Sequence, residues 1–147
     1  MRFEELAAAN AAIWGLGREG RAALRALRKR FPDKPLTLYC KRDEAEQAHA
    51  LIDGNIRVIG AAPDANALAA HDIVIKSPGI SAYKPEIVEA QKRGTRFTSG
   101  TALWFGENPN ARVIAVTGTK GKSTTTAMLA HCARHLGIRT ALAGNIG

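Results

Sequence analysis

Cysteines, aromatic residues and long apolar runs are scarce in this 147-residue sequence. The two cysteines, Cys40 and Cys132, have neither the spacing of a metal-binding pair nor that of a redox pair, and a reducing cytoplasm is the simplest setting for them. No apolar run approaches the length of a membrane-spanning helix. The N-terminal residues carry charges and no long apolar core, which argues against a signal peptide. We therefore expect a cytoplasmic protein without stable membrane association.

Acidic residues are in the minority, with 13 Asp and Glu against 21 Lys and Arg, a formal net charge of +8. A basic balance favours polyanionic partners such as nucleic acid, acidic membranes or phosphorylated small molecules. Much of the excess lies in residues 18–30, where helical spacing places Arg21, Arg25 and Arg28 on one face and leucines on another. We interpret this stretch as a solvated helix face over a core. Aromatic residues are not interleaved with these cations, so we expect no nucleic-acid partner.

Short apolar runs alternate with helical patterns over residues 11–98. Strands are expected at 11–14, 36–39, 56–59, 73–75 and 96–98. Helices are expected at 19–30, 43–51, 65–70 and 85–93, the second with Asp43 as its N-cap. This alternation predicts right-handed crossovers and a mainly parallel, Rossmann-like α/β sheet. Ligands of such sheets bind beside the carboxyl ends of the strands, so the informative loops are those after Trp14, Tyr39, Lys76 and Thr117.

A second unit is expected to begin near Asn108. Residues 113–116 form an apolar, β-rich run, a helix is predicted over 123–136, and a further strand is predicted over 140–143. One helix between two strands cannot bury both faces of a sheet. We therefore expect a first domain over residues 1–107 and a truncated α/β domain over residues 108–147.

The strongest motif is the segment Thr117–Thr124, which reads T-G-T-K-G-K-S-T between an expected strand and an expected helix. Glycines allow backbone N–H groups to close around phosphate oxygens, and the start of the helix adds its positive dipole end. Lys122 can reach the β- and γ-phosphates of ATP, and the Ser123 hydroxyl can bind Mg²⁺. The spacing G-x-x-G-K-S is shorter than that of the usual phosphate loop, because Val116 stands where that motif has its first glycine.

The segment Gly15–Gly20 reads G-L-G-R-E-G directly after the first expected strand, as in dinucleotide-binding turns. A tight strand-to-helix turn without any ligand would show the same pattern. NAD enzymes carry an acidic residue after the second strand, where it holds the ribose hydroxyls. Here Cys40, Lys41 and Arg42 stand at that place. This argues against NAD and leaves NADP or another phosphorylated nucleotide.

Two further patterns are less specific. The segment S-P-G-I at residues 77–80 ends the fourth expected strand, where it could contact a ligand or form only a turn. His131 and His135 lie four residues apart on an expected helix, as in two-histidine zinc sites. However, Cys132 replaces the glutamate of the protease motif, and no third ligand is evident. We expect a solvated helix face there.

Taken in order, these motifs resemble the Mur ligase family, which builds the stem peptide of peptidoglycan. The resemblance covers the whole chain, from the glycine-rich first turn through S-P-G-I and the loop T-G-T-K-G-K-S-T-T to G-N-I-G at 144–147. Within the family, the combination most resembles the branch that adds D-glutamate to UDP-N-acetylmuramoyl-L-alanine. A variant that adds L-glutamate, or another Mur ligase, stays open.

The resemblance implies an N-terminal domain that binds the UDP-substrate and a central domain that binds ATP and Mg²⁺. The residues that it assigns to the UDP-substrate are Gly15, Gly17, Arg18, Glu19, Lys41, Arg42, Ser77, Gly79 and Asn145. Those that it assigns to ATP are Gly118, Thr119, Lys120, Gly121, Lys122, Ser123 and Thr124. Lys122 would be catalytic and Ser123 would bind the metal. The implied substrates are UDP-N-acetylmuramoyl-L-alanine and glutamate, and we expect a monomer.

The reaction implied by the resemblance activates the L-alanine carboxylate through phosphoryl transfer from ATP, after which glutamate displaces phosphate from the acyl phosphate. We expect these residues to lack the family's second magnesium-binding acid, its modified lysine and its C-terminal domain, and therefore to be inactive alone. Two readings outside the family stay open. One is an NADP-dependent oxidoreductase domain that uses the first glycine turn, and the other is a non-enzymatic nucleotide-binding module.

Overall fold

The computed structural model describes residues 1–47 and 49–144 of the chain. The chain forms two compact units, Met1–Asn110 and Ala111–Gly147. Asn145, a residue predicted to contact the UDP-substrate, lies outside the described residues. None of the helices in the described part of the chain is long and apolar enough to cross a membrane.

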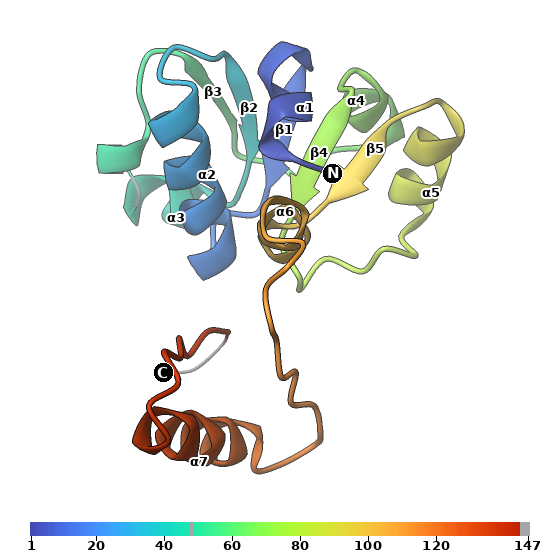
Figure 1. Ribbon diagram of the computed structural model, residues 1–147. Helices are drawn as coiled ribbons and strands as arrows, with labels where there is room; N and C mark the ends of the chain where they lie inside the picture. Colours follow the sequence, from blue (N-terminus) through green and yellow to red (C-terminus); the bar gives the residue numbers. More distant parts are fainter. Residues whose placement is uncertain (48, 145–147) are drawn as a thin grey trace. The chain divides into compact units, whose positions relative to one another are not determined.

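The first unit is built on a sheet of five parallel strands (Figure 1). The strands are β1 (Ala11–Trp14), β2 (Leu36–Tyr39), β3 (Ile56–Ile59), β4 (Ile73–Lys76) and β5 (Arg96–Thr98). Their order is β3-β2-β1-β4-β5, which confirms the predicted mainly parallel α/β sheet. Trp14 at the end of β1 is in register with Tyr39 and Lys76. The carboxyl ends of the three central strands therefore meet at one edge, and the strand order reverses between β1 and β4, where ligands of such sheets bind.

Helices cover both faces of this sheet. The helices between the strands are α2 (Arg18–Arg30), α3 (Arg42–Gln47), the 3₁₀ turn η1 (His49–Leu51), α4 (Ala65–Ala69) and α5 (Pro85–Lys92). Leu24 and Leu27 of α2 pack with Ile13 of β1 in one buried cluster. Leu68 of α4 and Ile87 of α5 pack with alternate residues of β1 and β4 in a second cluster. The period-2 alternation of β1 thus supplies both layers of the core.

Two helices at the ends of the first unit were not predicted. α1 (Phe3–Ala8) and α6 (Gly100–Glu107) both add residues to the cluster on the α2 side. The N–H of Phe3 donates to the Glu107 carboxylate at 2.9 Å, and Arg96 pairs with Glu5 at 2.7 Å. Six-residue and eight-residue helices are marginal by themselves, so these two depend on tertiary packing that a periodicity analysis does not detect.

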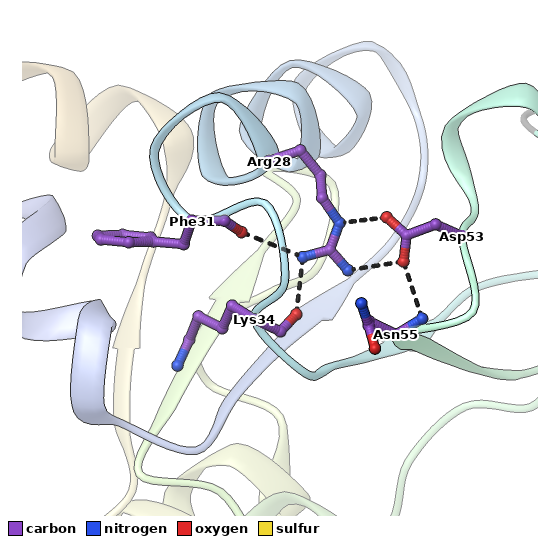
Figure 2. A network of polar contacts seen from close by, with 5 residues as sticks. All are labelled: Arg28, Phe31, Lys34, Asp53 and Asn55. Carbon is purple, nitrogen blue, oxygen red and sulfur yellow. Dashed lines mark hydrogen bonds and ion pairs between the residues drawn. The ribbon is translucent and has the colours of Figure 1, made fainter.

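The interpretation of the α2 arginines as a solvated face is wrong for Arg28. Figure 2 shows its guanidinium paired with both carboxylate oxygens of Asp53, at 2.6 and 3.1 Å. The same guanidinium donates to the carbonyl of Lys34 at 2.7 Å. Asp53 also accepts from the N–H of Asn55 at 2.9 Å. This network joins the end of α2 to the turns that precede β2 and β3. Arg28, one of the cations that make the chain basic, therefore has a structural role.

The predicted helix over 43–51 is shorter than expected and begins earlier. α3 starts at Arg42, so Asp43 lies in the first turn rather than at the N-cap. The carboxylate of Glu44 accepts from the N–H of Lys41 at 3.0 Å, which satisfies a donor at the helix start instead.

The second unit contains one helix, α7 (Lys122–His135), within its described residues. The strands predicted at 113–116 and 140–143 are not formed there. A β-strand needs a neighbour for its backbone N–H and C=O groups, and no described segment pairs with either run. Ile114, with 74% of its surface exposed, is correspondingly open to solvent.

Candidate functional site

The first glycine turn leads from β1 into α2 at the edge where the carboxyl ends of the strands meet. Gly15 has a φ of +92° and its N–H donates to the carbonyl of Tyr39 at 2.7 Å. Gly20 lies against Gly15 so closely that a Cβ atom on Gly20 would collide with the Gly15 carbonyl. The turn therefore needs glycine at both positions, as close strand–helix packing in a dinucleotide-type turn requires.

Ser77 joins the ends of β1 and β4 through hydrogen bonds. Its N–H donates to the carbonyl of Trp14 at 2.9 Å, and its hydroxyl donates to the carbonyl of Gly15 at 3.3 Å. A Cβ atom on Gly15 would lie 2.5 Å from the Ser77 hydroxyl. The two loops that the sequence nominated separately, at residues 15–20 and 77–80, are thus in contact at the reversal point of the sheet.

Lys76 is a feature of this edge that the sequence patterns did not identify. It is the last residue of β4, and its ammonium donates to the carbonyl of Ile80 at 2.9 Å. The contact closes the S-P-G-I segment into a turn, and the N–H of Ile80 donates back to the Ser77 carbonyl at 3.0 Å. The sequence signal that could have identified Lys76 is its positive charge at the end of an otherwise apolar strand. Gly79 lies within this turn, with open space where a Cβ atom would stand.

The segment after β2 lies beside the glycine turn in the strand order. Cys40 is buried, and its N–H donates a hydrogen bond to the carbonyl of Ile59. Burial raises the pKa of its thiol, and the negative charges of Glu44 and Asp43 raise it further. Lys41 and Arg42 are exposed. A protonated, buried thiol is a poor nucleophile, so Cys40 acts as packing while the two cations face solvent.

Arg18 and Glu19 occupy the first turn of α2. Arg18 is exposed and Glu19 is half-buried. The Glu19 Oε2 atom is buried and has no hydrogen-bond partner. A positive helix end beside two loop cations and Arg18 makes this edge attractive to an anion such as a diphosphate.

The segment Thr117–Thr124, predicted to be a phosphate loop, belongs to the second unit and leads into α7. Gly118 has a φ of +148° and Gly121 a φ of +76°, and Gly121 forms the N-cap of the helix. Residues 118–125 are exposed. The Lys122 ammonium folds back and donates to the carbonyl of Gly118, with the Thr119 carbonyl 3.5 Å away. The loop is therefore turned around the Lys122 ammonium and is neither extended nor buried.

The charged side chains of the segment that contains this loop are all basic. Residues 111–147 contain five basic side chains and no acidic one. Such a segment suits a polyanion, and Ser123 and Thr124 offer hydroxyl groups in the first turn of α7. Mg²⁺ in nucleotide sites is held by few protein ligands and by phosphate oxygens, so a hydroxyl without a neighbouring carboxylate fits that mode.

Residues 9–99 match the family model described as Mur ligase MurD-like, N-terminal domain. The chain belongs to this family. A UDP-N-acetylmuramoyl-L-alanine--L-glutamate ligase of Xanthomonas euvesicatoria is 54% identical over all of this chain and 32% of its own length. A protein of the same name from Salinispora tropica is 38% identical over all of this chain and 33% of its own length.

The chain thus spans about a third of the length of the curated Mur ligase relatives that it matches. Among solved structures, a UDP-N-acetylmuramate-alanine ligase of Thermotoga maritima aligns with a TM-score of 0.49 and 25% identity. That alignment covers 87% of this chain and 30% of the other.

Among the described residues, no three His, Cys, Asp or Glu side chains gather closely enough to hold a metal ion. His131 and His135 are exposed on α7. His71 is buried instead, and its ring contacts the Tyr39 hydroxyl at 3.1 Å and the Asn10 amide oxygen at 3.2 Å. Burial lowers the pKa of His71 and raises that of Tyr39, which keeps both groups neutral.

A cavity of about 420 Å³ lies away from the glycine turn. It is lined by residues of the second half of α2, including Leu24 and Arg28, and by Leu51 and Ile52. The Arg28–Asp53 pair forms part of its wall, and none of its lining residues belongs to the loops at the carboxyl ends of β1 and β4.

Proposed function

We propose that this chain is the N-terminal part of an ATP-dependent ligase that adds L-glutamate to the L-alanine carboxylate of UDP-N-acetylmuramoyl-L-alanine. The observation that carries the proposal is 54% identity, over every residue of this chain, to a relative named for that reaction. The resemblance in the motifs favoured the D-isomer, but the names of the relatives favour L-glutamate. The product would be a precursor of bacterial peptidoglycan, made in the cytoplasm by a monomeric enzyme.

The first unit is proposed to bind the UDP-substrate at its strand edge, within a domain over residues 1–107. Lys41 and Arg42 would lie near the uracil, and the glycine turn with Arg18 would hold the diphosphate. Ser77 and Gly79 would approach the diphosphate or the muramoyl group, and Glu19 would lie near the uracil or the diphosphate. The contact between Ser77 and Gly15 supports a single continuous site for these groups.

The second unit, residues 108–147, is proposed to bind ATP and Mg²⁺ through Gly118–Thr124. The chemical difficulty is that a carboxylate must approach the γ-phosphate, and both are anions. The Lys122 ammonium and the loop N–H groups would offset that repulsion and stabilise the charge that spreads over the phosphoryl oxygens. Lys120 would add a further positive charge, and Ser123 would hold Mg²⁺, which neutralises phosphate charge when bound. Attack of a carboxylate oxygen on the γ-phosphorus would release ADP and leave an acyl phosphate. The amine nitrogen of glutamate would then attack the acyl carbon, and phosphate would leave as the amide forms.

The full-length protein tests this proposal through release of ADP. We expect release to require both UDP-N-acetylmuramoyl-L-alanine and L-glutamate. Lys122→Ala should lower kcat by at least about 10²–10³-fold, because a preorganised cation is lost where charge develops. Lys92→Ala, which removes a cation exposed on α5, is the matched control and should keep full turnover.

Two results would count against the proposal. Turnover by the Lys122→Ala variant at the wild-type rate would refute the role of the loop. Turnover with D-glutamate but not with L-glutamate would keep the ligase assignment and overturn the stereochemistry.

A further inference from the structure

The loop over residues 77–84 joins β4 to α5 and is anchored at both ends. Near β4, Lys76 holds the carbonyl of Ile80, and the Ile80 side chain packs against the cluster around Trp14. At the far end Pro85 begins α5, where its fixed φ suits the first helical position. Figure 1 shows the loop leaving the tip of the β4 arrow and running to α5. The middle of the loop, residues 81–84, faces solvent.

Tyr83 lies in that middle section and is 90% exposed. Its N–H donates to the Ser81 hydroxyl at 3.2 Å, which sets the local turn. A single exposed aromatic residue is common on protein surfaces and needs no function by itself. This one, however, lies on the loop that carries Ser77 and Gly79, at the edge of the sheet where ligands bind.

The strand order, together with the proposed positions of the uracil and the diphosphate, indicates which part of a nucleotide sugar would reach this loop. The ends of β2, β1 and β4 follow one another along the edge. With the uracil beside Lys41 and the diphosphate at the glycine turn, the sugar comes next, at β4. Neighbouring strands are about 4.8 Å apart, so the uracil would lie about two strand spacings from the β4 loop.

We propose that Tyr83 packs its ring against the N-acetylmuramoyl sugar and sets specificity for that part of the substrate, an inference that rests on the proposed function. A sugar ring presents an apolar C–H face that a flat aromatic ring can cover, and the phenol hydroxyl stays in water. The anchored loop presents the ring without a large ordering cost, because both ends are already fixed.

Calorimetric binding to the full-length protein separates the sugar from the nucleotide. Tyr83→Ala should weaken binding of UDP-N-acetylmuramoyl-L-alanine about tenfold and leave binding of UDP unchanged. Tyr83→Phe keeps the ring and should bind both ligands like the wild type. Unchanged affinity of Tyr83→Ala for the whole substrate would overturn the proposal, and so would an equal loss for UDP, which would place the ring on the base.

The controls separate this proposal from the function on which it rests. Val88→Ala removes an exposed apolar side chain from α5 and should change neither affinity. The KM values for ATP and glutamate should be unchanged in Tyr83→Ala, and a rise confined to either one would also overturn the assignment to the sugar. If the wild-type protein binds UDP but not the muramoyl substrate, the proposed function itself fails.

Discussion

Gly20 shows how a single residue holds the candidate site together. It is buried at the start of α2, and the position that a Cβ atom would take is occupied by the Gly15 carbonyl. We expect Gly20→Ala to push α2 away from β1 and to lower the free energy of unfolding by about 1–3 kcal/mol. Urea unfolding measures this change.

Gly60 provides the matched control for that substitution. It follows β3, is exposed and has no atom within 4 Å of an added Cβ. Gly60→Ala should stay within about 0.5 kcal/mol of the wild type. Equal effects of the two alanines would mean that the close contact between Gly20 and Gly15 is not what requires glycine.

At the scale of residues, the spacing of the glycines predicted a local structure correctly, whereas the positions of the charged residues did not predict their partners. The pattern G-L-G-R-E-G predicted a tight turn, and the turn is present with a positive φ at Gly15. The partner of Arg28 could not be predicted, because Asp53 lies 25 residues further along the chain, on another connection. Periodicity places a side chain on a face of its own helix, and it does not say what another element brings to that face.

At the scale of elements, alternation predicted all five strands and the helices between them, because the strands and α2, α4 and α5 each bury residues against a neighbour. It predicted α3 too long, and the described side chains of that helix are exposed or half-buried. It missed α1 and α6, which are short and depend on each other through the contact of Phe3 with Glu107. It also predicted strands at 113–116 and 140–143 from apolar, β-branched composition. Composition describes the preference of a segment, but hydrogen-bonded neighbours decide whether a strand forms.

His71 adds side-chain contacts between three neighbouring strands of the sheet. It lies between α4 and β4 and contacts Tyr39 at the end of β2 and Asn10 before β1. Burial lowers its pKa below the ordinary 6.5, although nearby Asp72 opposes the shift. The unfolded chain therefore takes up the proton first as the pH falls. The stability that depends on neutral His71 is complete above about pH 6.5 and is lost below it, until the folded state is protonated too.

The direction of this shift predicts how stability depends on pH. His71→Gln should lower the free energy of unfolding at pH 7.5 by about 1–3 kcal/mol, since the buried Tyr39 hydroxyl loses a hydrogen-bond partner, as does the exposed Asn10 amide. It should also reduce the loss of stability between about pH 7.5 and 5.5 relative to the wild type, measured by urea unfolding at each pH. His131→Gln, on the exposed face of α7, should reproduce the wild-type dependence. An unchanged slope in His71→Gln would show that His71 does not titrate differently in the two states.

For the whole molecule, the two units differ in what stabilises them. The first unit contains all of the buried residues of both hydrophobic clusters, and every strand of the described sheet lies in it. Among residues 111–144, only Ala130 is buried. The second unit also carries five basic side chains with no acidic partner among its own residues. Burial drives folding, and like charges oppose it, so stability must be concentrated in residues 1–110.

This division predicts how separate pieces of the chain should behave. A chain of residues 1–110 should unfold cooperatively with a Tm within a few degrees of that of residues 1–147, because it keeps the whole core. A peptide of residues 111–147 should show little helical circular dichroism in water, since a 14-residue helix without a buried face is marginal. Calorimetry of the two longer chains and circular dichroism of the peptide test both parts. A Tm for residues 1–110 that falls by more than about 10 °C would show that the second unit contributes a substantial share of the stability, which its exposed side chains do not explain.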